Sequence, residues 1–257
     1  MTSFPAAPFP VQSPAVSEGV AAAAIRRLTA LTPLDETDLA CLDAAADRAR
    51  GYPLRHAFMT IGRPMPEPLL LLHGWAARVR ILPDGRRQFM SFYLPGDVIG
   101  SAHQALPIAS ATVIALTECT ACPAPAAPAG SGLAQAYAVG EALDEAYLLG
   151  HVVQLGRLNA QERIGDFLLE IYERLSLAGL TVGGSFEMPL TQEMLADALG
   201  LTPVHVNRMI QQARRDGELM WKSGRVLLRD PERTARTIGR FSPQVTGTQK
   251  LPAITPG

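Results

Sequence analysis

The sequence lacks the features that would assign it to several large classes of protein. None of its apolar runs reaches the roughly 18 residues that a membrane-spanning helix needs. Its N-terminus has no basic stretch followed by an apolar core, so no secretory signal is visible. Three cysteines cannot build a disulfide framework, which fits a reducing compartment. We therefore expect a cytoplasmic protein without a membrane partner.

Signatures of catalysis and metal binding are missing as well. The five histidines are scattered, and none of them forms the His-x-His or His-Glu-x-x-His spacing of a metal site. The segment around Ser185 does not match the Gly-x-Ser-x-Gly turn of a hydrolase. We therefore expect no catalytic residue, no metal ligand and no enzyme activity.

A large net charge is also absent, because 23 basic and 24 acidic side chains leave a balance of −1. The charges are unevenly distributed, however. Residues 1–199 carry 13 basic and 20 acidic side chains, a balance of −7, whereas residues 200–257 carry 10 and 4, a balance of +6. This asymmetry suggests an acidic module joined to a basic one. A solvated surface explains such an excess as well as a polyanionic partner does. Local sequence motifs are needed to distinguish the two explanations.

The 257 residues fit one or two domains with a real core, and 47% of them are apolar. Two short amphipathic helices are expected between residues 20 and 46, separated near Pro33. We expect an α+β protein in which residues 17–132 form an antiparallel β-barrel, with extended tails at 1–16 and 239–257. The barrel is indicated by four β-prone runs separated by turn residues, at 69–73, 75–82, 88–94 and 112–116.

Residues 133–158 contain no proline and predict a helix of about 39 Å. Small and apolar residues recur on it at spacings of three and four, the pattern of a helix that packs on a partner helix. The stripe could pack on the barrel of its own chain, but a helix of this length overhangs so small a barrel. We therefore expect a homodimer paired through this helix. The predicted seam is Val139, Leu143, Ala146, Gly150, Val153 and Arg157.

The most specific pattern lies in the basic C-terminal part. Thr191 suits the N-cap of a short helix that Gly200 ends, and Thr202 suits the N-cap of the next helix. Pro203 fits the first position of that second helix, where no backbone donor is needed. Small and apolar residues between these points have the spacing of a helix-turn-helix, which an ordinary helical hairpin would match only in part. Residues 159–238 are therefore expected to form a winged helix-turn-helix domain.

The second helix of such a motif lies in the major groove of DNA, with its N-terminal residues at the base edges. Arg208 is the best base reader there, because its guanidinium fork matches O6 and N7 of guanine. Thr202 and His205 suit phosphates, as does the basic turn at Lys222, which indicates a wing. We therefore expect double-stranded DNA as a partner. The predicted contacts are Thr191, Gln192, Thr202, Pro203, Val204, His205, Asn207, Arg208, Arg214, Lys222 and Arg225.

A small barrel, a long helix and a winged helix-turn-helix, in this order, resemble the Crp/Fnr family of bacterial transcription regulators. The resemblance extends over about residues 20–230 and is most specific in residues 85–97 and 189–208. It implies a jelly-roll barrel like that of cyclic-nucleotide-binding domains, a homodimer on a palindromic operator, and contact with RNA polymerase. Val204 stands where the recognition helix of the family usually carries Glu, which implies a different operator.

The residues that hold a cyclic nucleotide in this family are absent from the matching positions. The binders carry Gly-Glu and, later, an Arg-Ser or Arg-Ala pair whose Arg holds the phosphate. Here Gly100 precedes Ser101, and Ala109 stands before Ser110 where the Arg is expected. The resemblance therefore implies no cyclic AMP in the usual mode. A different small-molecule effector at Gly100, Ser101, Ala109 and Ser110 stays open.

Two other cofactors of the family are not expected either. An iron–sulfur cluster needs about four thiolates, and Cys41, Cys119 and Cys122 supply three. His103 lies one position away from the haem ligand of the family's carbon monoxide sensor, without the accompanying Cys. Cys119 and Cys122 have the spacing of a redox pair, but at a strand end such residues more often pack. The alternative function is a ligand-binding or scaffold β-barrel without specific DNA recognition.

Overall fold

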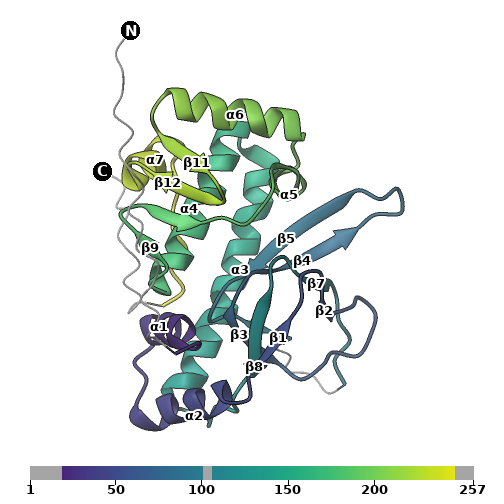
Figure 1. Cartoon of the computed structure of the whole chain (residues 1–257), viewed down its shortest axis with the longest axis vertical. Coiled ribbons are helices and arrows are strands. Elements are labelled where there is room, and N and C mark those ends of the chain that lie inside the picture. The colour runs from purple at the N-terminus through teal and green to yellow at the C-terminus, as the bar shows by residue number, and fades with distance from the viewer. Residues whose placement is uncertain (1–18, 101–105, 247–257) are drawn as a thin grey trace.

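A computed structural model describes residues 19–100 and 106–246 of the chain (Figure 1). The expected tail at 1–16 and the end of the other tail, residues 247–257, lie outside these ranges. Figure 1 shows a β-barrel, a long helix beside it, and a C-terminal domain packed along the upper part of that helix. No helix in the described part is long and apolar enough to cross a membrane.

The described chain begins with two helices, α1 (Ala22–Leu31) and α2 (Glu36–Ala46), which confirms the predicted pair. Asp35 and Asp38 form a capping box at the start of α2, in which Asp38 N donates to Asp35 Oδ1 at 2.8 Å. Asp38 Oδ2 also accepts from Leu133 N at 3.2 Å. One carboxylate therefore helps to start two helices that are far apart in the sequence.

In its described residues the barrel has two four-stranded antiparallel sheets, in agreement with the predicted fold class. One sheet has the order β1 (Arg50–Tyr52), β8 (Cys119–Pro123), β3 (Leu69–His73) and β6 (Val98–Ile99). The other has the order β2 (Ala57–Met59), β7 (Thr112–Ala115), β4 (Ala76–Ile81) and β5 (Arg87–Tyr93). The strands β3, β4, β5 and β7 match the predicted runs to within one residue at each end. The others were missed because β1, β2 and β6 are too short to alternate and β8 has few β-branched residues.

Cys119 and Cys122 lie on opposite faces of β8, because side chains three residues apart on a strand point to opposite sides. Cys119 is buried between the sheets with Phe58 and Val113, whereas Cys122 is buried beside Leu133 and the helices. Burial raises the pKa of both thiols above its ordinary value. These two residues pack in separate cores and do not form a redox pair.

The long helix α3 (Gly132–Arg157) begins after Ser131, whose Oγ caps its first turn. Its first half packs into its own chain: Val139 and Leu143 are 5% and 1% exposed and share a cluster with Leu28 of α1. The prediction that these two side chains form a dimer seam is therefore wrong. The physical reason is that α1 covers this half of α3, a contact between distant segments that the helical pattern alone does not reveal.

The second half of α3 keeps apolar side chains at the surface. Leu149, Val152 and Val153 are 62%, 68% and 57% exposed, and Gly150 and Arg157 are exposed as well. Ala146, by contrast, is half-buried. The outward row that runs along the whole helix is thus shifted by one residue from the predicted one, although Gly150, Val153 and Arg157 of the predicted seam are exposed too. This row consists of Ala138, Ala142, Glu145, Leu149, Val152 and Gly156. Ala142 is half-buried, and the other five residues are exposed.

The C-terminal domain combines four helices with a four-stranded antiparallel sheet. The helices are α4 (Ala160–Leu177), α5 (Gln192–Leu199), α6 (Pro203–Arg215) and α7 (Pro231–Ile238). The sheet has the order β11 (Leu219–Lys222), β12 (Arg225–Leu228), β10 (Ser185–Glu187) and β9 (Thr181–Val182). This is the predicted winged helix-turn-helix, with the β11–β12 hairpin as the wing.

The turn between α5 and α6 has the predicted chemistry. Thr191 and Thr202 are the N-caps of the two helices, and Pro203 is the first residue of α6. Gly200 ends α5 with a φ of 63°, in the left-handed region that favours glycine. Local backbone preferences at these four positions therefore fix where the two helices begin and where α5 ends.

The barrel and the C-terminal domain share one apolar cluster. Phe92 of β5 and Phe167 of α4 meet edge to face, with ring centroids 5.3 Å apart. Beside them, Gln88 Nε2 of β5 donates to the carbonyl of Ala198 in α5 at 2.8 Å. The β4–β5 hairpin thus contacts the helix-turn-helix directly (Figure 1).

His151 of α3 lies in the same region, where α3, α4 and α5 meet. Its side chain is partly buried near the carbonyl of Ala198, and its Nε2 has no hydrogen-bond partner among the described residues. Burial lowers the pKa of His151 below its ordinary value, although Gln154, Asp166 and the Ala198 carbonyl act in the opposite direction. The folded protein therefore favours the neutral imidazole.

We expect His151→Asn to reduce the acid sensitivity of folding. Because the folded pKa lies below the unfolded value of 6.5, the stability linked to His151 is complete above pH 6.5 and is lost as the pH falls through the folded pKa. Urea unfolding at about pH 7.5 and about pH 5.5 measures the difference, with the exposed His73→Asn as control. An equal loss in wild type and His151→Asn would contradict the assignment.

Candidate nucleic-acid interface and cavity

The predicted base readers lie together on one exposed face of α6. Val204 is 80% exposed, and Asn207 and Arg208 follow at the three- and four-residue spacing that places side chains on the same face. On the opposite face Val206 and Ile210 are buried in the domain core. The apolar face therefore fixes α6 to its domain, and the polar face remains available to a partner.

The predicted phosphate contacts lie at the N-terminal ends of α5 and α6. The Oγ1 atoms of Thr191 and Thr202 accept from the backbone N of Met194 and His205 at 3.1 and 3.2 Å. Thr191, Thr202 and Pro203 are exposed, and His205 is half-buried. Both helices therefore begin at exposed N-caps, where the partial positive charge of a helix N-terminus favours phosphate groups.

The polar side chains of this surface differ in whether they already make a hydrogen bond within the protein. Asn207 Nδ2 donates to Gln192 Oε1 at 2.9 Å, which links α6 to the first residue of α5. The side chains of Arg208 and Arg214 make no hydrogen bond or ion pair within the part of the chain that the structure describes, and both are exposed. Two guanidinium groups are thus available to a polyanion without first breaking a contact.

The wing places further cations at its tip. Ser223 and Gly224 have φ values of 52° and 72°, so a two-residue turn joins Lys222 to its strand partner Arg225. Lys222 is exposed. Arg225 Nη1 pairs with Glu187 Oε1 at 3.4 Å, a contact that the sequence does not indicate. Of these two cations, Arg225 therefore has an ion-pair partner in the described structure and Lys222 has none.

A cavity of about 820 Å³ lies between the barrel and α3. Gly100 and Ser110, two of the four residues named for an effector pocket, line it. Ala109 does not line the cavity, because its side chain is buried between the sheets at 2% exposure. Ser101 and His103 lie outside the described residues.

The cavity wall carries charges that are already paired. Arg27 Nη2 lies 2.6 Å from Asp97 Oδ1, and Arg78 Nη2 lies 3.1 Å from Asp144 Oδ2. Burial raises the pKa of Tyr93 to about 12, so its neutral hydroxyl accepts from Arg78 at 2.6 Å. Apolar residues complete the wall, among them Met59, Met65 and Ile108. A phosphate in this cavity would have to displace a carboxylate from one of the two described arginines.

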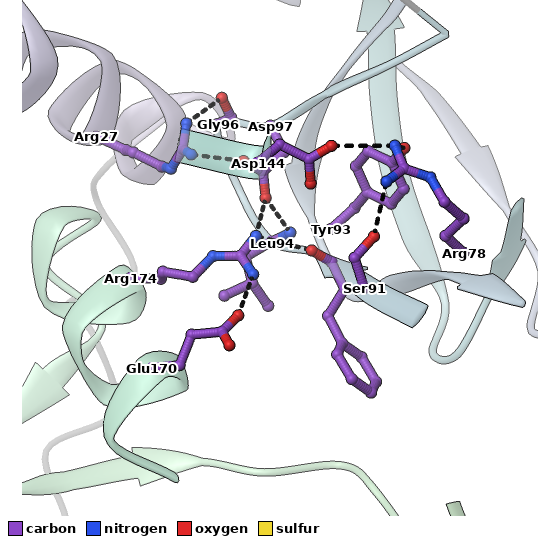
Figure 2. A network of polar contacts seen from close by, with 11 residues as sticks. Arg27, Arg78, Ser91, Tyr93, Leu94, Gly96, Asp97, Asp144, Glu170 and Arg174 are labelled. Carbon is purple, nitrogen blue, oxygen red and sulfur yellow. Dashed lines mark hydrogen bonds and ion pairs between the residues drawn. The ribbon is translucent and has the colours of Figure 1, made fainter. Parts of the chain in front are cut away.

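Figure 2 shows that Asp97 lies at the centre of a larger network. Asp97 Oδ1 pairs with Arg27 of α1, whereas Asp97 Oδ2 accepts from Arg174 Nη2 of α4 at 2.9 Å. Arg174 also donates to the carbonyl of Phe92 at 2.7 Å and to Glu170 Oε1 at 2.9 Å. One turn of the barrel is thus ion-paired to both the N-terminal helix and the C-terminal domain.

The electrostatics of this network follow from its burial. Burial acts to lower the pKa of Arg174, but the carboxylates of Asp97 and Glu170 outweigh it and raise the pKa above its ordinary value. Burial raises the pKa of Glu170, and the neighbouring Arg174 compensates only in part. Removing Arg174 would therefore leave two carboxylates in a poorly solvated place.

Sequence reasoning missed the residues that join the domains. Arg174 is 77 residues from Asp97, and no periodic signal links such a pair. Arg240, placed in an expected tail, is buried against α4, where it pairs with Asp166 and with Glu173. No sequence signal marks this arginine out, because it follows Arg233 and Arg236 in the same basic segment.

Two family models match the chain, one for a cyclic nucleotide-binding domain at residues 52–128 and one for a Crp-like helix-turn-helix domain at residues 162–236. The chain is 32% identical over 169 residues to the nitrogen fixation regulation protein FixK of Bradyrhizobium diazoefficiens, over 63% of this chain and 70% of the relative. It is 28% identical over 225 residues to the transcriptional activator protein FnrL of Cereibacter sphaeroides, over 84% and 90% of the two chains.

Two solved structures of similar fold support the same assignment. The structure of FixK2 from Bradyrhizobium japonicum matches 72% of this chain and 94% of its own, with a TM-score of 0.63 and 26% identity. That of TTHB099, a transcriptional regulator of the CRP family from Thermus thermophilus, shares the fold over 76% and 98%, with a TM-score of 0.58 and 21% identity.

The chain belongs to the Crp/Fnr family. It is a DNA-binding transcription regulator with a cyclic-nucleotide-binding-like barrel and a C-terminal helix-turn-helix. The family is one of transcription regulators and not of enzymes. A barrel protein without DNA recognition, the alternative from the sequence, is therefore not favoured.

We expect Arg174→Met to destabilise the protein by about 3 kcal/mol, because it removes the ion-pair partner of buried Glu170 and one of the two partners of Asp97. Thermal and urea unfolding measure the change. Arg86→Met is the matched control and should have no measurable effect, since its pair with Asp84 is exposed. The double variant Arg174→Met, Glu170→Gln should recover part of the loss. An Arg174→Met variant as stable as wild type would contradict the role of the network.

Proposed function

We propose that the protein acts as a homodimer that reads a palindromic DNA site through α6 and regulates transcription by contact with RNA polymerase. The observation that carries the proposal is the exposed row Val204, Asn207 and Arg208 on a helix fixed by its apolar face. Arg214, further along α6, and Lys222, at the tip of the wing, are exposed cations that can bind phosphates. Because its target is DNA, we place its action in the cytoplasm.

The proposed dimer forms through the second half of α3. Leu149, Val152 and Val153 are all more than half exposed on a helix whose other side is packed. Exposed apolar residues at spacings of three and four are typical of a helix that pairs with a partner helix. A two-fold axis along this helix would present two copies of α6, as a palindromic site requires.

We further propose that the cavity takes a small-molecule effector without the usual cation–phosphate pair. The support is that Arg27 and Arg78, the arginines on the described wall, are both held by carboxylates. The wall around them is largely apolar, with Met59, Met65 and Ile108. Mass spectrometry of small molecules released from the purified protein, together with its absorption spectrum and metal content, is the direct test.

We expect the double variant Leu149→Glu, Val152→Glu to be monomeric, because like charges would oppose each other across the seam. Size-exclusion chromatography with light scattering at micromolar concentration measures the mass. Ile81→Glu on the β4–β5 hairpin is the control, since it changes an equally exposed apolar residue away from α3. A monomeric wild-type protein, or a dimeric double variant, would overturn the proposed interface.

We expect Arg208→Ala to weaken specific binding by roughly 1–3 kcal/mol and to relax discrimination at one base pair in each half-site. Lys222→Ala, at the exposed tip of the wing, should instead lower the slope of log affinity against log salt by about one and leave base preference unchanged. Fluorescence anisotropy on a site selected by the wild-type protein measures both. If Arg208→Ala lowers specific and non-specific affinity equally, Arg208 does not read a base.

A further inference from the structure

Two amide side chains on the DNA-facing side of the helix-turn-helix are hydrogen-bonded to each other. Asn207 Nδ2 of α6 donates to Gln192 Oε1 of α5 at 2.9 Å. The bond joins residues 15 positions apart, with Asn207 exposed and Gln192 half-buried. A hydrogen bond at the surface contributes little to folding because water replaces either partner. Its consequence is therefore geometric: it restricts the orientation of the Asn207 amide.

The donor and acceptor groups left on Asn207 define what it can read. The amide of an asparagine has two N–H donors and one carbonyl acceptor. Gln192 takes one donor, so one N–H and the carbonyl of Asn207 remain. An N–H and a carbonyl side by side are the complement of N7 and the N6 amino group of adenine in the major groove. Guanine presents two acceptors there, and one of them would face the carbonyl.

The neighbours of Asn207 suit adjacent base pairs. Val204 lies one turn earlier on the same face, is 80% exposed, and can contact the methyl group of a thymine. Arg208 is the next residue, and its side chain has no partner among the residues described here. Asn207 therefore lies between an apolar reader and a guanidinium, in the part of α6 that enters the groove.

We infer that Asn207 recognises an adenine in each half-site and that Gln192 is a positioning residue that orients its amide. The inference rests on the proposed function, because it needs α6 in the major groove. Gln192 was predicted as a DNA contact on its own. The bond to Asn207 adds a second role, since Gln192 Nε2 still has its donors for a phosphate while Oε1 holds the base reader.

The first step of the test is selection of a site from random duplex DNA by the full-length wild-type protein. Enrichment of a palindromic site supports the proposed function, and failure to enrich any site overturns that function together with the inference. Each adenine of the selected half-site is then replaced in turn by 7-deazaadenine, which lacks the N7 acceptor. We expect one position to lose roughly 10-fold in affinity with wild type and to lose nothing further with Asn207→Ala.

An enriched site at which no adenine shows this dependence on Asn207 would overturn the inference while leaving the proposed function intact. Asn207→Asp is the second variant, because it keeps the carbonyl-type acceptor and the size of the side chain but has no N–H donor. We expect it to lose the sensitivity to 7-deazaadenine, as Asn207→Ala does. Retained sensitivity in Asn207→Asp would also overturn the assignment.

The role of Gln192 is separated from that of a phosphate contact by two further variants. Gln192→Met removes the acceptor, and we expect the preference for adenine over guanine at the Asn207 position to fall about 5-fold. Gln192→Glu keeps the acceptor and should retain that preference while total affinity falls, because a carboxylate repels phosphate. Gln135→Met on α3, an exposed glutamine far from α6, is the control. If Gln192→Met lowers the affinity for all sequences equally, Gln192 is a phosphate contact and not a positioning residue.

Discussion

The carboxylate of Asp97 is the interaction on which the arrangement of the domains depends. Its Oδ1 pairs with Arg27 and its Oδ2 with Arg174, so one buried group joins α1, the barrel and α4 (Figure 2). The preceding residue must be glycine, because Gly96 has a φ of 93° and a Cβ there would lie 2.9 Å from the Arg27 side chain. The Pro-Gly-Asp turn of the barrel therefore serves two purposes. It closes a loop between strands, and it presents one anion to cations from two other parts of the chain.

The same groups also form part of the cavity wall, and this links the two ends of the molecule. Arg27 and Asp97 line the cavity, and Arg174 beside them belongs to the helix that leads into the helix-turn-helix. A molecule bound in the cavity, as proposed above, would contact Asp97, which is itself paired with Arg174 of α4. Phe92 adds an apolar contact, since its ring packs on Phe167 while its carbonyl accepts from Arg174. The domain contact therefore combines a buried ion pair, which is sensitive to geometry, with an aromatic contact that is more tolerant.

The parts that the sequence predicts well are those governed by local chemistry. Thr191, Gly200, Thr202 and Pro203 each act through their own backbone or the next turn, so the helix-turn-helix could be read residue by residue. The seam on α3 shows the limit of such reasoning. Helical spacing predicts a stripe, but which of two adjacent stripes is covered by α1 depends on a tertiary contact. The hydrogen bonds of Arg174 and of Gln192 could not be predicted from the sequence at all. They join side chains that are distant in the sequence, and their pairing depends on the completed fold.

The charge distribution bears on the proposed reading of DNA by a short row of side chains. The segment from residue 200 onward has an excess of six positive charges, but several of its cations are engaged within the protein. Arg240 is only 6% exposed and neutralises Asp166 and Glu173, and Arg225 and Arg236 face Glu187 and Glu232. The count of basic residues therefore overstates the attraction for phosphate. When the sequence-independent attraction to phosphates is weak, binding depends more strongly on direct contacts with base edges, and these contacts discriminate among sequences. A preoriented amide is favoured in such a surface, because the entropy cost of ordering it is met when the protein folds and not when it binds DNA.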